Sequence, residues 1–153
     1  MIKRYIVILL SLLMFSCSVT SNKEETVLNF LKENEITVTK PSLVIILPNN
    51  SCSFCVNRII GYLNEKNTTE KIILLFLESK VLTMLDKDTL EELKAKIKVK
   101  NKELDDFIKT GLLVKSDNYY KPLFIEIEKK ITIHEIESSG DYQKYYNIIN
   151  KYY

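Results

Sequence analysis

The stretch LVIILPNNSCSFC, residues 43–55, is the part of this 153-residue chain from which the fold can be predicted. Residues 43–47 are apolar without the alternation of a half-exposed strand, which indicates a strand buried on both faces. From Cys52 onward the apolar residues follow the three-and-four spacing of a helix, and Cys52 and Cys55 share its apolar face. A helix N-terminus has unpaired backbone N–H groups and a partial positive charge, so it stabilises a thiolate in its first turn. The sequence therefore predicts a redox-active dithiol at a strand-to-helix junction.

The rest of the chain supplies a second buried strand and further helices. Residues 72–77 are another uninterrupted apolar run, and two such strands joined by a helix make a parallel β-α-β unit with a right-handed crossover. We then expect a capped helix, a short helix, an antiparallel hairpin with one wetter face and a tyrosine-rich amphipathic helix, at residues 88–97, 104–111, 122–136 and 142–153. The Lys-rich stretch 94–102 is interpreted as a solvated helix face. The predicted class is α/β, with a central mixed sheet, the element order β-α-β-α-β-β-α and flanking helices.

The first sixteen residues have the pattern of an export signal. A basic pair, Lys3-Arg4, precedes an apolar run that is shorter than the roughly 20 residues of a permanent membrane helix. The run ends in MFSC, residues 14–17, which resembles the lipobox of bacterial lipoproteins and implies that Cys17 is lipidated. We therefore expect a signal peptide at 1–16, a lipidated cysteine with a tether and lead-in segment at 17–40, and a folded domain at 41–153. An ordinary secretory signal or an uncleaved signal anchor are the alternatives, and both also place the body of the chain outside the cytoplasm.

Charge and cysteine count restrict the partners that we expect. Removal of Lys3 and Arg4 with the signal leaves 20 basic residues against 20 acidic ones, so nothing suggests a nucleic-acid partner. If Cys17 carries lipid, Cys52 and Cys55 are the remaining thiols. The single histidine, His134, is interpreted as an exposed strand residue, and a structural zinc site would need four ligands. We therefore expect neither a metal nor a cofactor.

The predicted element order has a Cys-x-x-Cys at the start of the first helix and Pro122 at the opening of the strand after the second helix. Over residues 41–153 this resembles the thioredoxin fold, and more narrowly the membrane-tethered thiol-disulfide oxidoreductases of the TlpA and ResA type. The resemblance implies that Cys52 attacks a disulfide and that Cys55 resolves the mixed disulfide. It also implies that Pro122 is a cis-proline beside the dithiol, with Lys121 next to the sulfurs in the substrate groove. Tyr120 immediately precedes this pair, and its position leaves two interpretations: a residue that lines the groove or a packing residue.

The resemblance leaves two functions open. One is an extracytoplasmic reductase, lipid-anchored on the periplasmic side of a bacterial membrane, which exchanges disulfides with protein thiols and receives electrons from a membrane donor. The other is a binding lipoprotein in which Cys52 and Cys55 form a structural disulfide. Ser51 stands where the family very often has tryptophan, and residues 43–47 contain no carboxylate, so Glu78 or water would have to serve as the base.

Overall fold

The computed structural model describes residues 18–48, 51–77, 85–113, 115–116, 119–135 and 142–153 of the chain. The chain divides into two compact units, Met1–Thr37 and Val38–Tyr153. In the first unit, helix α2 (Ser18–Glu33) lies within the predicted tether and lead-in segment. The chain leaves this helix through Glu35, which has a positive φ of 54°, and the Asn34 side chain donates a hydrogen bond of 2.9 Å to the Phe30 carbonyl.

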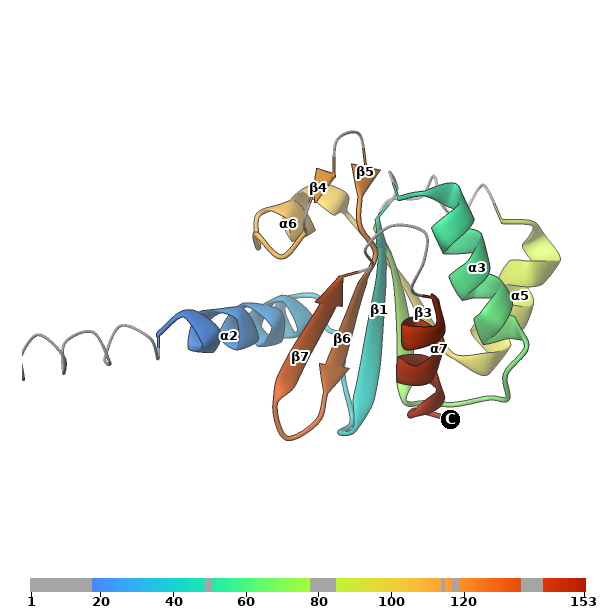
Figure 1. Ribbon diagram of the computed structural model, residues 1–153, viewed down its shortest axis with the longest axis horizontal. Coiled ribbons are helices and arrows are strands. Elements are labelled where there is room, and N and C mark those ends of the chain that lie inside the picture. The colour runs from blue at the N-terminus through green and yellow to red at the C-terminus, as the bar shows by residue number, and fades with distance from the viewer. Residues whose placement is uncertain (1–17, 49–50, 78–84, 114, 117–118, 136–141) are drawn as a thin grey trace, which may run out of the picture. The chain divides into compact units, whose positions relative to one another are not determined.

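A five-stranded mixed sheet forms the centre of the second unit (Figure 1). Its spatial order is β3-β2-β1-β6-β7, and the strands are β1 (Ser42–Pro48), β2 (Ile72–Leu77), β3 (Lys98–Lys102), β6 (Leu123–Ile127) and β7 (Ile131–Glu135). The central strand β1 pairs in parallel with β2 and antiparallel with β6. Strand β1 has a neighbouring strand on each side, and both of its faces are buried. This burial explains why its apolar sequence is not interrupted by polar residues.

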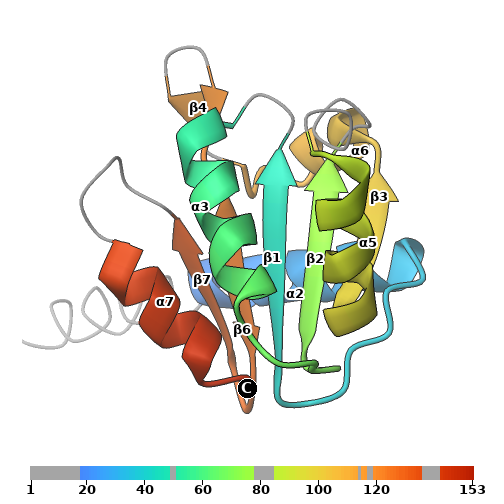
Figure 2. The same cartoon turned by 90° about the vertical axis from the view of Figure 1, so that its right-hand side faces the viewer.

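Three helices cover one face of this sheet: α3 (Ser53–Asn64), α5 (Lys87–Lys96) and α7 (Tyr142–Asn150), as Figure 2 shows. Alternate residues of β1 and β2 point toward them because successive strand side chains point to opposite faces. The resulting cluster contains Leu43, Ile45, Leu47, Ile72, Leu74 and Phe76 from these strands, Val56, Ile59, Ile60 and Leu63 from α3, Leu93 from α5, and Tyr145, Ile148 and Ile149 from α7. The structure therefore has the α/β architecture that the sequence predicts, with a mixed sheet and flanking helices.

The region between the second helix and the hairpin differs from the expectation. The sequence predicts a solvated helix face at residues 94–102, but the second half of this stretch is strand β3, which pairs in parallel with β2. An edge strand requires only one apolar face, and Val99 packs against the core while lysines flank it. Helix α6 (Leu104–Ile108) follows, and then a small antiparallel ladder of β4 (Lys115–Ser116) and β5 (Tyr119–Tyr120).

The predicted antiparallel hairpin is present as β6 and β7, with Ile125 opposite Ile133. The prediction that one face of this hairpin is wetter is wrong, because Glu126 on that face is only 7% exposed. Phe124 shares this face and packs with Tyr145 of α7, with ring centroids 5.1 Å apart. The local alternation of Glu and Ile could not reveal that a helix from the end of the chain would cover the carboxylate.

Candidate dithiol site

Cys52 and Cys55 lie at the start of helix α3, just beyond the end of the central strand. Cys52 is the N-cap residue, with a non-helical backbone (φ −54°, ψ 114°), and its carbonyl accepts the Val56 N–H at 3.0 Å. Both cysteines are free thiols. Cys52 is partly exposed, whereas Cys55 is only 6% exposed and faces the packed side of the helix. The geometry thus separates an accessible thiol from a buried one that lies one turn further along.

The surroundings of the two thiols shift their acidities in opposite directions. The Cys55 thiol, which donates toward the Cys52 sulfur, is the main reason that the pKa of Cys52 lies below its ordinary value. The nearby backbone N–H groups of Cys55 and Phe54 act in the same direction, although they form no formal capping hydrogen bond. Burial raises the pKa of Cys55. At neutral pH, Cys52 is therefore the thiol with more thiolate, and Cys55 is the one that holds its proton.

Tyr142, the first residue of α7, contacts the buried thiol. Its hydroxyl donates a hydrogen bond of 3.5 Å to the Cys55 sulfur. Its ring meets that of Phe54 edge to face, with centroids 6.1 Å apart and an interplanar angle of 87°. The Arg58 guanidinium lies 4.7 Å from the centroids of both rings, within the range of a cation–π interaction. The helical spacing of the C-terminal tyrosines predicts packing residues and gives no signal for this contact.

The segment before β6 reaches the dithiol loop through Ser51. The Ser51 hydroxyl donates a hydrogen bond of 3.0 Å to the Tyr120 carbonyl, and Lys121 and Pro122 are the next two residues. Pro122 is buried, and Tyr120 and Lys121 are half-buried. The Lys121–Pro122 bond is not cis, so the cis geometry implied by the resemblance is wrong here; in the described part of the chain the cis bond is Lys40–Pro41. A trans bond is the usual state of a proline. The Ser51 hydroxyl binds the carbonyl of Tyr120, two residues before Pro122, and not the carbonyl of the Lys121–Pro122 bond.

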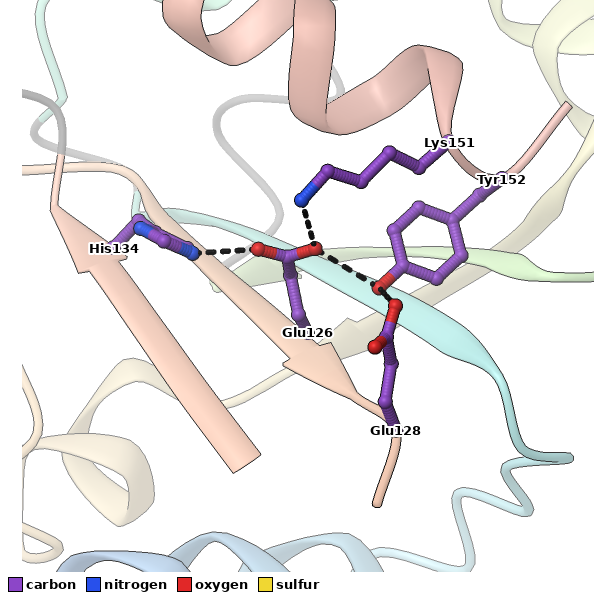
Figure 3. A network of polar contacts seen from close by, with 5 residues as sticks. All are labelled: Glu126, Glu128, His134, Lys151 and Tyr152. Atoms are coloured by element: carbon purple, nitrogen blue, oxygen red, sulfur yellow. Dashed lines mark hydrogen bonds and ion pairs between the residues drawn. The ribbon is translucent and has the colours of Figure 1, made fainter. Parts of the chain in front are cut away.

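A second polar cluster lies around Glu126 (Figure 3). Its carboxylate accepts hydrogen bonds from His134 Nε2 at 2.7 Å, Lys151 Nζ at 3.0 Å and the Tyr152 hydroxyl at 3.1 Å. The Tyr152 oxygen also lies 3.2 Å from Glu128 Oε1, and its single proton can serve one carboxylate at a time. The expectation of an exposed His134 is therefore wrong, since its side chain is 22% exposed and paired.

Burial and hydrogen bonding compete at the Glu126 carboxylate. Burial acts to raise its pKa, but the hydrogen bonds from Lys151 and His134 outweigh burial and hold the pKa below its usual range. Burial, followed by the two carboxylates, raises the pKa of Tyr152, which keeps its proton for donation. The cluster thus stabilises a negative charge under α7 and fastens the end of that helix to the hairpin.

Glu126 is too far away to act as the base for the dithiol. In the sheet register Glu126 lies opposite Leu43, five residues before Pro48. At about 3.3 Å per residue, this places Glu126 roughly 16 Å from the end of β1 that leads to Cys52. A surface hollow lined by Lys40, Pro41 and the hairpin residues Glu128 and Lys129 lies at the same remote end of β1.

Several predicted features lie outside the described residues: the signal segment 1–16, the lipobox cysteine Cys17 and the candidate base Glu78. In the part of the chain that the structure does describe, no three His, Cys, Asp or Glu side chains gather closely enough to hold a metal ion. Within that same part, none of the helices combines the length and the apolar character needed to cross a bilayer.

Comparisons of this chain with protein-family models, with curated proteins and with solved structures find no match. The resemblance to thioredoxin-like proteins therefore rests on the residues of this chain and on the element order alone.

Proposed function

We propose that this protein is a thiol-disulfide oxidoreductase of the thioredoxin-like class that works through Cys52 and Cys55. The observation that carries the proposal is the pairing of the two thiols at the start of α3. The partly exposed Cys52 has a lowered pKa, and the buried Cys55 can reach it from the next turn. A low pKa and partial exposure are the properties of a reactive cysteine. An inert structural cysteine is normally buried, as Cys55 is.

The element order also supports a thioredoxin-like fold. The series β1-α3-β2-α5, then the hairpin β6-β7 and helix α7, contains the order β-α-β-α-β-β-α that the resemblance implies. Strand β3, helix α6 and the β4-β5 ladder are inserted between α5 and β6. The hydrogen bond from Ser51 to the Tyr120 carbonyl links the segment before β6 to the dithiol loop. This segment contains Tyr120, Lys121 and Pro122, which form the proposed substrate groove.

The proposed reaction has two steps. The Cys52 thiolate attacks one sulfur of a disulfide in a partner protein, the partner's S–S bond breaks, and the partner's departing thiolate takes up a proton from solvent. Cys55 then loses its proton, and its thiolate attacks the Cys52 sulfur, which releases the second partner thiolate and forms the Cys52–Cys55 disulfide. Two electrons pass to the partner, so a membrane-bound dithiol donor is needed to reduce the protein again. The reductive direction is proposed from the resemblance.

We propose that the protein works outside the cytoplasm, attached to a bacterial membrane by a lipid on Cys17. The basic and apolar signal pattern of residues 1–16 and the MFSC sequence support this location. Substitution of Cys17 by serine should release the protein from the membrane fraction. Continued attachment of the C17S variant would instead favour an uncleaved signal anchor.

Covalent trapping tests the enzymatic proposal directly. In a Cys55→Ser variant the mixed disulfide cannot be resolved, so partner proteins should accumulate on Cys52 as conjugates that a reducing agent releases. The matched Cys52→Ser variant keeps one thiol at nearly the same place but lacks the attacking sulfur, and it should trap nothing. If C55S traps no more than C52S, and the wild-type disulfide resists moderately reducing glutathione buffers, the enzyme is excluded and the protein is a binding lipoprotein with a structural disulfide.

A further inference from the structure

The buried position of Cys55 creates a difficulty for the second step of the proposed reaction, on which this inference rests. Cys55 must ionise before it can attack, yet it is 6% exposed and burial raises its pKa. Strand β1 offers no carboxylate to assist, and Glu126 lies near the opposite end of that strand. Among the described residues, the side chain outside the dithiol that hydrogen-bonds to the Cys55 sulfur is Tyr142.

We propose that Tyr142 is a catalytic residue of this dithiol, and that its hydroxyl stabilises the Cys55 thiolate by a hydrogen bond while the mixed disulfide is resolved. The hydroxyl already lies 3.5 Å from the Cys55 sulfur in the dithiol form and donates to it. When Cys55 ionises, the same contact becomes a charge-assisted hydrogen bond, which is roughly twice as strong as a neutral one. Because the contact strengthens as charge develops on the sulfur, it lowers the barrier of the second step more than it stabilises the resting state.

Tyr142 acts in this scheme as a donor that keeps its own proton. Burial and the hydrogen bond to Cys55 raise the pKa of Tyr142 to about 12, so the phenol stays neutral across the physiological range. The proton lost by Cys55 passes to solvent, and the departing partner thiolate takes a proton from solvent in turn. The step therefore balances as one thiol and one mixed disulfide giving one intramolecular disulfide and one partner thiol.

The position of the hydroxyl is fixed from both ends of α7. At the dithiol end, Phe54 from between the two cysteines packs against the Tyr142 ring, and Arg58 lies over both rings. Further along α7, the Tyr145 hydroxyl donates a hydrogen bond of 2.6 Å to the Glu135 carbonyl. Just beyond the helix, Tyr152 donates to Glu126. A donor held in this way needs little reorganisation when the thiolate forms.

Two measurements on Tyr142→Phe test the role, and Tyr145→Phe is the matched control. Tyr145 is also buried on α7 and also loses a hydrogen bond, but its hydroxyl contacts the Glu135 carbonyl and not a sulfur. The first measurement needs no turnover: in a Cys52→Ser background, the ultraviolet absorbance of the thiolate is followed as the pH rises. Removal of the Tyr142 hydroxyl should move the Cys55 titration to higher pH, while Y145F should leave it in place. An unchanged titration in Y142F would overturn the proposal, whatever the fate of the enzymatic function.

The second measurement follows a single turnover of the reduced full-length protein with a chromogenic aromatic disulfide. The first aromatic thiol is released when Cys52 attacks, and the second is released when Cys55 resolves the conjugate. In Y142F the first release should keep its rate, and the second should slow by about tenfold near neutral pH, in keeping with the loss of one hydrogen bond to a charged group. Equal slowing of both steps, or equal slowing in Y145F, would show a structural effect and refute the proposal. If the wild-type protein does not release the second aromatic thiol, both the proposed function and the role of Tyr142 are refuted. If both aromatic thiols are released normally but C55S traps no partner protein, only the proposed function is refuted.

Discussion

Replacement of Glu126 by glutamine should loosen the attachment of the C-terminal helix, because this carboxylate joins α7 to the hairpin. Glu126 is 7% exposed and accepts hydrogen bonds from His134, Lys151 and Tyr152. Glutamine has nearly the same size, but its amide NH₂ group is a donor and cannot accept a hydrogen bond from these three donors. Its neutral oxygen also makes weaker hydrogen bonds than a carboxylate. Glu128→Gln is the matched control, since Glu128 is exposed and shares the same Tyr152 proton.

The size of the effect follows from the burial of the three donors. The Lys151 side chain is 56% exposed, so its ion pair with Glu126 contributes between zero and about 1 kcal/mol. Tyr152 is 1% exposed and the His134 side chain is 22% exposed, and hydrogen bonds to a charged group contribute about 1.5–3 kcal/mol each. Relief of the desolvation of Glu126 offsets part of this sum. We expect the free energy of unfolding to fall by about 2–3 kcal/mol, and the melting temperature by roughly 10 °C for a domain of this size.

The pH dependence of this effect has a definite sign. Because the pKa of Glu126 is lower in the folded protein than its usual value of 4.5, its contribution is fully present above that value. The contribution disappears as the pH falls through the lowered pKa. Melting curves of wild-type protein, E126Q and E128Q, followed by circular dichroism from neutral to acidic pH, should therefore show a gap between wild type and E126Q that shrinks on acidification. A constant gap, or equal losses in E126Q and E128Q, would refute the reasoning.

Two further predictions concern the dithiol helix. Alkylation of Cys52 at neutral pH should be slower in Cys55→Ala than in Cys55→Ser. The Cys55 side chain is the main cause of the lowered Cys52 pKa, and a serine hydroxyl can replace its hydrogen bond whereas alanine cannot. Equal rates would show that the backbone N–H groups are enough to lower the pKa of Cys52. Leu63→Ala should lower the free energy of unfolding by about 2–5 kcal/mol in urea denaturation, since Leu63 is fully buried in the cluster between α3 and the sheet. A loss under about 1 kcal/mol would mean that the site collapses around the smaller side chain.

The strand-to-helix junction could be predicted because its signals are local. Five consecutive apolar residues at 43–47 and helical spacing from Cys52 define β1 and α3 without knowledge of their neighbours. Strand β3 cannot be predicted in this way, because its signal is not local. Its sequence, KVKNK, has one clearly apolar residue, Val99, and becomes a strand because β2 offers a free parallel edge.

The environment of the polar residues could not be predicted in the same way. The alternation around Glu126 is what a half-exposed hairpin would show, and only the position of α7 over that face makes the carboxylate buried. The Tyr142 contact with Cys55 joins residues that are 87 positions apart. No spacing rule relates such residues, since their separation depends on how α7 docks on the sheet.

Local sequence is sufficient to place the two thiols at the end of a buried strand and in the first turn of an amphipathic helix. Periodicity and helix-end effects act within a few residues, so a single sequence is enough to define them. Long-range packing establishes the contact of Tyr142 with the Cys55 sulfur, the burial of the Glu126 carboxylate, and the hydrogen bond from Ser51 to the Tyr120 carbonyl. These contacts arise when distant segments pack on the sheet, because burial and hydrogen bonding between them depend on the whole fold and not on neighbours in the chain.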